Sequence, residues 1–180
     1  MKNLFVGIDF SKEKIDATVI SAIGLVEQSA RVSSEFKTTA CGYRQFLKWV
    51  EEHSNSIDMS SWLFCGENTG DYSKPLCNYL YGKGYDMWLE NAKCIKDASG
   101  LRRLKTDRAD SAMIAEYTMR NHDRALYYRP LSDSLSQLRE LFLYRHMIVR
   151  HKCSFQVRKE EKRMTMEKSP SRTLISNRPR

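Results

Sequence analysis

The pattern of apolar and polar residues at the start of the chain predicts three consecutive β-strands. Asn3–Asp9 is an apolar run that ends in an acid, and Lys14–Ser21 alternates apolar with polar side chains. A turn at residues 22–24 leads into a third stretch, Leu25–Val32. Short runs rich in β-branched and aromatic residues are typical of strands. Because connections this short cannot hold a parallel crossover, we expect these strands to pair in an antiparallel manner.

After these strands, helical periodicity alternates with further apolar runs. Residues 92–106 sustain no periodicity, and we predict a basic loop there. The order of three strands followed by alternating helices and strands is typical of a mixed five-stranded sheet flanked by helices. We therefore expect an α/β fold of the ribonuclease H-like class. In chain order, the further predicted elements are a helix over Gly42–His53, a strand over Trp62–Glu67, a helix over Ser73–Tyr81, a strand over Tyr85–Glu90 and a helix over Asp107–Arg120.

The last part of the chain is predicted to form one long basic helix and then a tail without structure. From Leu131 to about Met166, apolar residues recur at helical spacing with arginines and lysines between them. From Ser169 on, Ser, Pro and Arg dominate, which favours disorder. The expected organisation is a ribonuclease H-like domain over 1–128, a basic helical segment over 129–168 and a disordered tail over 169–180.

The positive charge of the chain is concentrated in this C-terminal part. Residues 1–128 contain 17 Lys and Arg against 17 Asp and Glu, whereas residues 129–180 contain 13 against 5. The whole formal net charge of +8 therefore belongs to the last 52 residues. A neutral body with a basic extension is typical of proteins that bind a polyanion, most often nucleic acid. A solvated helix with a charged, disordered tail is the alternative interpretation.

Length and cysteine usage exclude several classes of protein. A chain of 180 residues can form one domain of ordinary size plus an extension. No apolar run approaches the roughly 18 residues of a membrane helix. Lys12, Glu13 and Lys14 follow the first apolar run too closely for a signal peptide. The five cysteines form no C-x-x-C pair, which argues against a disulfide framework or a structural zinc site and favours the cytoplasm.

Four carboxylates stand where ordinary surface charge does not explain them. Asp9 and Glu67 close two apolar runs that are predicted to be buried strands. Asp107 and Asp110 begin a predicted helix three residues apart. A carboxylate at the end of a buried strand is costly unless a cation meets it. Acids that converge from two strand ends and one helix can hold two divalent metal ions for phosphoryl transfer, and Mg²⁺ (or Mn²⁺) suits such hard oxygen ligands.

Each acid also has a simpler explanation when it is taken alone. Asp107 could be the N-cap of its helix with Asp110 at the third helical position, and strand-terminal acids can pair with lysines. Asp16 on the second predicted strand could be a fifth carboxylate of the site, but we expect it to be a solvated strand residue. The histidines show no metal-ligand spacing, and we expect surface positions for His53, His122, His146 and His151.

Basic side chains are predicted to bind nucleic acid in two places. The predicted loop before Asp107 puts cations beside the acids, where a phosphate backbone could bridge both. The C-terminal helix carries further arginines and lysines between its apolar residues. The predicted nucleic-acid-binding residues are Lys93, Lys96, Arg102, Arg103 and Lys105 in the loop, with Arg139, Arg145, Arg150 and Lys152 in the helix.

Three short motifs together resemble the DEDD transposases of the insertion-sequence-110 family and their relatives, the Piv invertases. The motifs are Gly7-Ile8-Asp9-x-Ser11-Lys12, Glu67-x-Thr69-Gly70-x-Tyr72 and Lys105-Thr106-Asp107-x-x-Asp110. The similarity covers roughly residues 3–155, and the three blocks together are specific where any one alone is weak. The chain departs from the family pattern at Asn91-Ala92, where the family usually has Asn-Pro, and at Ser111, where Ala usually follows the last Asp.

The resemblance implies the fold of the RuvC Holliday-junction resolvase and a metal-binding, catalytic tetrad of Asp9, Glu67, Asp107 and Asp110. It further implies metal-dependent cleavage and strand transfer of DNA during transposition, with Mg²⁺ as cofactor. The implied partners are DNA, a guide RNA and a second copy of the chain bound through the basic helix. Full-length family members continue into a second domain that supplies a nucleophilic serine, and we expect this domain to be missing here.

Two other classes of function compete with this interpretation. Actin-like sugar kinases and ATPases share an early strand-terminal acid, but they need a Gly-rich phosphate turn that Asp9-Phe10-Ser11 does not supply. They also need a duplicated domain, for which the chain is short. The second alternative is a catalytically inactive remnant of a truncated transposase that binds nucleic acid or dimerises without turnover.

Overall fold

The computed structural model describes residues 2–22, 31–99 and 107–167, without the side chains of residues 99, 107, 108, 166 and 167. It divides into two compact units, Met1–Pro130 and Leu131–Arg180. No helix within the described ranges is long and apolar enough to cross a membrane. The predicted tail over 169–180 lies outside the described residues.

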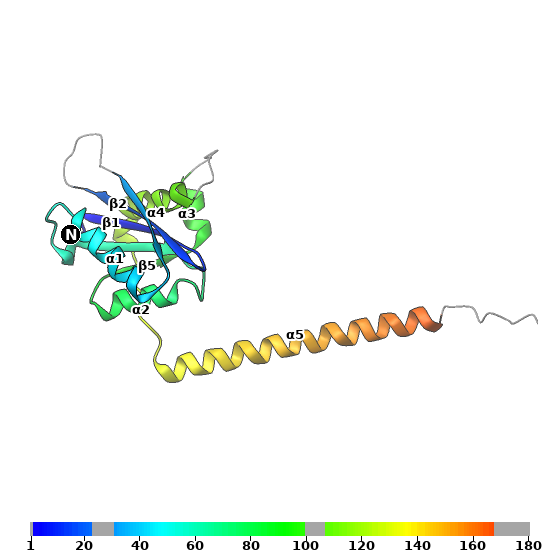
Figure 1. The fold of residues 1–180 in the computed structure, drawn as a ribbon. Coiled ribbons are helices and arrows are strands. Elements are labelled where there is room, and N and C mark those ends of the chain that lie inside the picture. The colour runs from blue at the N-terminus through cyan, green and yellow to red at the C-terminus, as the bar shows by residue number, and fades with distance from the viewer. Residues whose placement is uncertain (1, 23–30, 100–106, 168–180) are drawn as a thin grey trace, which may run out of the picture. The chain divides into compact units, whose positions relative to one another are not determined.

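The first unit is built on a mixed five-stranded sheet (Figure 1). The sheet order is β3-β2-β1-β4-β5, in which β1, β2 and β3 pair antiparallel and β1, β4 and β5 run parallel. An antiparallel meander continued by parallel crossovers confirms the predicted α/β, ribonuclease H-like class. The strands are β1 (Leu4–Phe10), β2 (Lys14–Ser21), β3 (Val32–Lys37), β4 (Trp62–Glu67) and β5 (Met87–Glu90).

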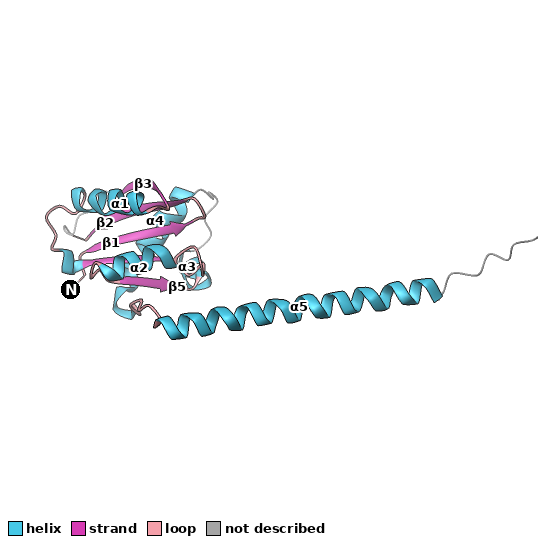
Figure 2. Ribbon diagram, turned by 60° about the horizontal axis from the view of Figure 1, so that its bottom comes forward, coloured by secondary structure: helices cyan, strands magenta, loops and turns pink. Residues whose placement is uncertain are grey.

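Helices cover both faces of this sheet (Figure 2). One face packs against α1 (Ala40–Glu52) and α2 (Lys74–Gly82), and the other against α3 (Ala92–Ser99) and α4 (Asp107–Asn121). Short 3₁₀ turns lie at Met59–Ser61 and His122–Arg124. The start of α1 is fixed by its N-cap, because the side-chain oxygen of Thr39 accepts a hydrogen bond from the Gly42 amide.

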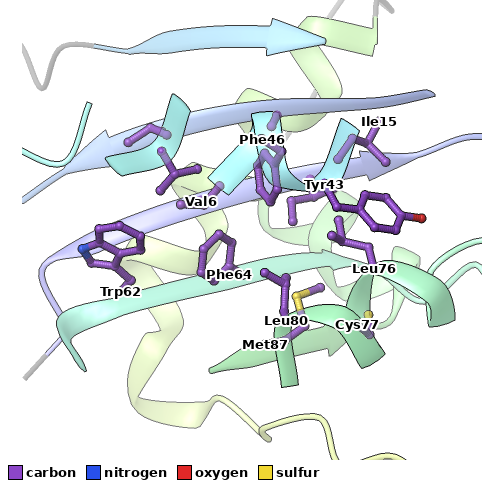
Figure 3. Close-up of a cluster of buried hydrophobic side chains, with 14 of the residues drawn as sticks. Val6, Ile15, Tyr43, Phe46, Trp62, Phe64, Leu76, Cys77, Leu80 and Met87 are labelled. Atoms are coloured by element: carbon purple, nitrogen blue, oxygen red, sulfur yellow. The ribbon is translucent and has the colours of Figure 1, made fainter. Parts of the chain in front are cut away.

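The larger apolar cluster lies between the sheet and the α1/α2 layer (Figure 3). Alternate residues of β1 and β4, such as Val6 and Phe64, point into it, where they meet Phe46 of α1 and Leu80 of α2. Full burial of one such side chain stabilises the fold by roughly 1.5–3 kcal/mol. Trp62 closes one end of the cluster and its indole N–H donates to the Ile57 carbonyl oxygen at 3.0 Å, so its polar atom is satisfied.

The opposite face of the sheet is brought very close to α4 by Gly7. A Cβ atom at this position would overlap the backbone carbonyl oxygen of Ser111 and the backbone nitrogen of Ala115. The second apolar cluster continues this contact with Phe5 of β1 and Ile114 of α4. The absence of a side chain at Gly7 therefore allows the helix backbone to lie directly on the central strand.

Two predicted elements differ from the structure. The third strand was predicted over Leu25–Val32, but the strand in this place is Val32–Lys37, and residues 25–30 lie outside the described part of the chain. The prediction missed it because β3 is an edge strand whose only large apolar side chain after Val32 is Phe36. The predicted basic loop over 92–106 contains α3, which is anchored by the buried side chain of Ile95.

The second unit contains the helix α5 (Asp133–Glu167), which confirms the predicted long basic helix. Its described side chains are exposed almost throughout, including large apolar ones. Leu141, Phe142, Leu143 and Tyr144 are consecutive and all exposed by half or more of their surface. Since successive residues turn by about 100° around a helix, these four side chains surround α5 rather than forming one stripe.

The close contact at Gly7 gives a direct test of the fold. We expect Gly7→Ala to lower the free energy of unfolding by about 3 kcal/mol or more, because the methyl group has to displace helix backbone rather than a flexible side chain. Gly82→Ala is the matched control, since nothing lies within 4 Å of a Cβ built there. Urea unfolding of the two variants measures the difference, and equal stability would contradict the contact.

Candidate active site

Asp9 and Glu67 lie side by side at the carboxyl ends of two neighbouring parallel strands. The last paired residues of β1 and β4 are Ile8 and Gly66, so the two acids occupy the next position on each strand. Side chains alternate between the faces of a sheet, and Ile8 points into the α1/α2 cluster. Asp9 and Glu67 therefore share the opposite face, which α4 covers, and both are partly buried.

The strand register extends this pair into a row of five acids across the whole sheet. Asp9 pairs with Asp16 of β2, Asp16 pairs with Glu35 of β3, and Glu67 pairs with Glu90 of β5. All five belong to the face that α4 covers, because residues that pair directly across neighbouring strands share one face of a sheet. We call this set the acid row: Glu35, Asp16, Asp9, Glu67 and Glu90.

Helix α4 lies with its first turns over the carboxyl ends of these strands. Ser111 and Ala115 contact β1 at Gly7, two residues before Asp9. At the other end of the helix, the ring of His122 lies 5.2 Å from that of Phe5, near the start of β1. The helix thus runs opposite to β1, and Asp107 and Asp110 belong to the helix end nearest Asp9. Asp110 is partly buried, while the side chain of Asp107 lies outside the described residues.

Three polar contacts fix how α4 is rotated on the sheet. The Ser111 and Thr18 hydroxyl oxygens lie 2.8 Å apart, and Thr18 makes a second contact of 2.8 Å with Ser33 of β3. Further along the helix, Arg31 donates to the buried Glu116 carboxylate at 2.5 Å. Near its C-terminal half, the Tyr117 hydroxyl donates to the Glu90 carboxylate at 3.2 Å. These contacts fix the rotation of α4 and therefore the side of the helix on which Asp110 lies.

In the described part of the chain, acids of the predicted tetrad lie near the carboxyl ends of β1 and β4, but they do not form a complete metal-binding site. Asp9 and Glu67 are neighbours, and Asp110 lies on the helix above them. Among the described residues, no group of three acids, histidines or cysteines is close enough to hold a metal ion. The chemistry of the donor set still fits a hard divalent cation, since every predicted ligand is a carboxylate.

Asp16 differs from its prediction as a solvated strand residue. It is only 4% exposed, and its carboxylate lies 3.1 Å from the Lys14 ammonium group. The same ammonium lies 3.0 Å from Glu35, so Lys14 neutralises the β2/β3 end of the acid row. The prediction was wrong because alternating apolar and polar side chains along β2 indicate one buried and one solvated face of the sheet. In the structure, α4 covers the second face as well.

Glu90 is a candidate site residue that the sequence analysis missed. It closes the apolar run Met87-Trp88-Leu89 just as Asp9 and Glu67 close theirs, and this strand-terminal position is the signal that could have found it. Both of its carboxylate oxygens accept hydrogen bonds, one from the Asn91 amide at 2.6 Å and one from Tyr117. Burial and the adjacent Glu90 carboxylate raise the pKa of Tyr117 to about 12, so its phenol remains a donor at neutral pH.

The cysteine on β4 is a core residue rather than a ligand of this site. Cys65 is fully buried beneath α4, and burial raises the pKa of its thiol to about 12. The thiolate form that binds metals is therefore suppressed at neutral pH. Cys77 is buried in the α1/α2 cluster, and burial raises its pKa to about 12 as well.

A transposase family model, that of the insertion-sequence-110 DEDD type, matches residues 6–161 of the chain. The chain belongs to this family. The match spans all three acidic motifs and most of α5, and it confirms the assignment predicted from the motifs. No curated protein matches this transposase chain.

Two solved structures similar to this transposase chain are both of RuvC. Thermus thermophilus RuvC in complex with a Holliday junction substrate has 9% sequence identity, with a TM-score of 0.48. A structure of Thermus thermophilus RuvC alone has 11% identity and a TM-score of 0.45. Each similarity covers 69% of this chain and 99% of the RuvC chain.

The second motif of this transposase forms the turn that follows β4. The Thr69 amide donates to the Glu67 carbonyl oxygen at 2.9 Å, and Gly70 has a φ of 72°, a conformation that glycine adopts without strain. The Ser73 hydroxyl donates to the Gly70 carbonyl oxygen at 3.0 Å. Tyr72 lies on this turn with 51% of its surface exposed.

The residues predicted to bind nucleic acid are divided between the two units. Lys93 and Lys96 are exposed on α3, where the Asn91 side chain caps the helix by accepting from the Lys93 amide. Arg102, Arg103 and Lys105 lie outside the described residues. The four predicted side chains of α5, all exposed, are Arg139, Arg145, Arg150 and Lys152.

The hydroxyl contact between α4 and β2 gives a second test. Ser111 and Thr18 are both fully buried, so we expect Ser111→Ala to lower the free energy of unfolding by about 1 kcal/mol and Thr18→Val, which breaks two contacts, by about 2 kcal/mol. Thr165→Ala on α5 is the control, because its hydroxyl is exposed, and we expect a change below about 0.5 kcal/mol. Urea unfolding measures all three, and a neutral Thr18→Val would contradict the buried contact.

Proposed function

We propose that this transposase chain cleaves and joins DNA phosphodiester bonds with the help of divalent metal ions held by Asp9, Glu67, Asp107 and Asp110. The observation that carries the proposal is the neighbouring position of Asp9 and Glu67 on one face, beneath the helix end that bears the other two acids. Family membership supports the same assignment, because the three acidic motifs lie within the matched residues.

Magnesium, with manganese as its substitute, is the proposed cofactor. When bound, two such ions stabilise the attacking and the leaving oxygen of an in-line displacement at phosphorus. The chain contributes the oxygen ligands, which Mg²⁺ prefers. The apolar cluster beneath them, with Phe5, Cys65 and Trp88, excludes water from the buried side of the site and keeps the strand ends in register.

The proposed partners are DNA and, by family resemblance, a guide RNA. In the first unit, Lys93 and Lys96 lie on α3, the helix that directly follows Glu90 in the chain. Cations close to the acid row could bind the phosphates on either side of a scissile bond. In the second unit, α5 supplies further cations for a sequence-independent contact with the phosphate backbone. We also propose that the chain acts in the cytoplasm, where it meets the nucleic acid.

A second candidate is a chain that binds nucleic acid and dimerises without turnover. The observation that favours it is that the described acids do not come close enough together to hold a metal ion. The exposed apolar side chains of α5 also suit a helix that pairs with another copy of itself. The two candidates make different predictions for the response of the chain to metal ions.

Metal binding is tested by thermal unfolding of the full chain in Mg²⁺ and Mn²⁺. We expect the midpoint to rise with metal concentration, by the equivalent of about 1.4 kcal/mol at ten times the dissociation constant. Asp107→Asn and Asp110→Asn should abolish this rise, because each removes a charged ligand. Asp123→Asn, an exposed acid beyond the end of α4, is the control and should respond like the wild type. If neither metal ion raises the unfolding midpoint of the wild type, the result favours the second candidate.

DNA binding is tested by substituting Arg139, Arg145, Arg150 and Lys152 together by Gln. We expect weaker binding to duplex and branched DNA and a shallower dependence of affinity on salt, by up to about 0.9 for each phosphate that the variant no longer neutralises. Asp107→Asn should leave this binding intact, because the carboxylates make no favourable contact with phosphate in the absence of metal. Titrations at several salt concentrations measure the slope, and an unchanged slope would contradict a role for α5.

A further inference from the structure

Glu90 holds a place in the acid row that the proposed tetrad does not explain. It pairs in register with Glu67 on the adjacent parallel strand, and neighbouring strands lie about 4.8 Å apart. Both side chains are on the face of the sheet that α4 covers. Like charges directly opposite each other on a sheet are destabilising, so this arrangement requires a compensating interaction.

The protein fixes the Glu90 carboxylate with two donors and no cation among the described residues. The Asn91 amide and the Tyr117 hydroxyl each donate a hydrogen bond to one of its oxygens. The Tyr117 ring also packs against the Trp88 ring, with the ring centroids 5.4 Å apart. Within the described ranges, no Lys, Arg or His forms an ion pair with Glu90. The carboxylate is therefore oriented, while its charge is not neutralised by these residues.

The opposite end of the acid row is arranged differently. There Lys14 lies close to both Asp16 and Glu35, at 3.1 and 3.0 Å, and supplies the cation that two adjacent acids need. Among the described residues, the Lys14 cation at one end and neutral donors at the other leave the Glu67/Glu90 end as the more negative part of the row. An added cation would be attracted to that end.

We propose that Glu90 is a positioning residue of the metal site: its fixed charge beside Glu67 strengthens the binding of a divalent cation by the tetrad. The inference rests on the metal site proposed above and adds a fifth acid to it. Glu90 acts through its neighbour and through the water molecules of the bound ion, as carboxylates beyond the direct ligands of a metal commonly do. The like-charge repulsion between Glu67 and Glu90 is relieved when the ion is present.

The test uses Glu90→Gln, which removes the charge, keeps one oxygen to accept from the Asn91 amide and places an NH2 group that can donate to the Tyr117 hydroxyl oxygen. Direct binding of Mn²⁺ to the full chain is followed through the electron spin resonance signal of the free ion. We expect the dissociation constant to rise about tenfold, the lower end of the effect of such residues. The thermal midpoint without metal should be no lower than that of the wild type, because a repulsion is removed.

Glu35→Gln is the matched control. It removes one acid from the other end of the same row, three strands away from Glu67 and paired with Lys14. At about 14 Å and ordinary ionic strength its charge is screened from the site, so Mn²⁺ binding should remain that of the wild type. Tyr117→Phe releases one Glu90 oxygen, and we expect it to weaken Mn²⁺ binding in the same direction as Glu90→Gln but less.

The outcomes separate this inference from the proposed function. If the wild type binds Mn²⁺ and Glu90→Gln binds it equally well, Glu90 merely anchors Tyr117 and the inference is wrong while the metal site stands. The same holds if Glu35→Gln weakens binding as much as Glu90→Gln, since the effect is then one of total charge. If the wild type itself binds no Mn²⁺, the proposed metal site is overturned and the role of Glu90 with it.

Discussion

The structure of the first unit depends on the direct contact between the backbone of α4 and the central strand β1. Gly7 makes this contact possible, because any side chain there would overlap the helix at Ser111 and Ala115. The contact sets the height of α4 above the sheet, and the buried hydroxyl pair of Thr18 and Ser111 sets its rotation. Since Asp110 directly precedes Ser111, the same packing that stabilises the fold also fixes where the acids of the helix lie.

The acids of the acid row repel one another across the sheet. Each of the five strands carries an acid on the same face, and a sheet tolerates like charges in register only when cations or donors compensate them. Lys14 compensates one end, and the Tyr117 hydroxyl and the Asn91 amide orient the other. Negative charge held in this way at the carboxyl edge of the parallel strands favours the binding of a divalent cation, and through it of a phosphate.

The two units differ in how they bury apolar side chains and in their charge. The first buries its apolar side chains on both faces of a sheet and has nearly balanced charge. The second presents apolar and basic side chains around one helix, and its exposed Leu141–Tyr144 segment is larger and more continuous than solvated helices usually carry. Within the described chain, the acid row and the excess of positive charge thus belong to separate units of one transposase.

The sequence by itself determined the fold class through its apolar pattern and the family through its three acidic motifs. Runs such as Trp62–Glu67 and Lys14–Ser21 carry strand signals strong enough to place these elements at their true ends, and the motifs around Asp9, Glu67 and Asp107 identified the transposase. It misplaced β3 and overlooked α3, where a single residue, Phe36 or Ile95, makes the main apolar contact. Only the tertiary structure decided that Asp16 is buried and that Glu90 stands beside Glu67. Both depend on strand register and on the layer above the sheet, and these arise from contacts between residues far apart in the chain, which local periodicity does not encode.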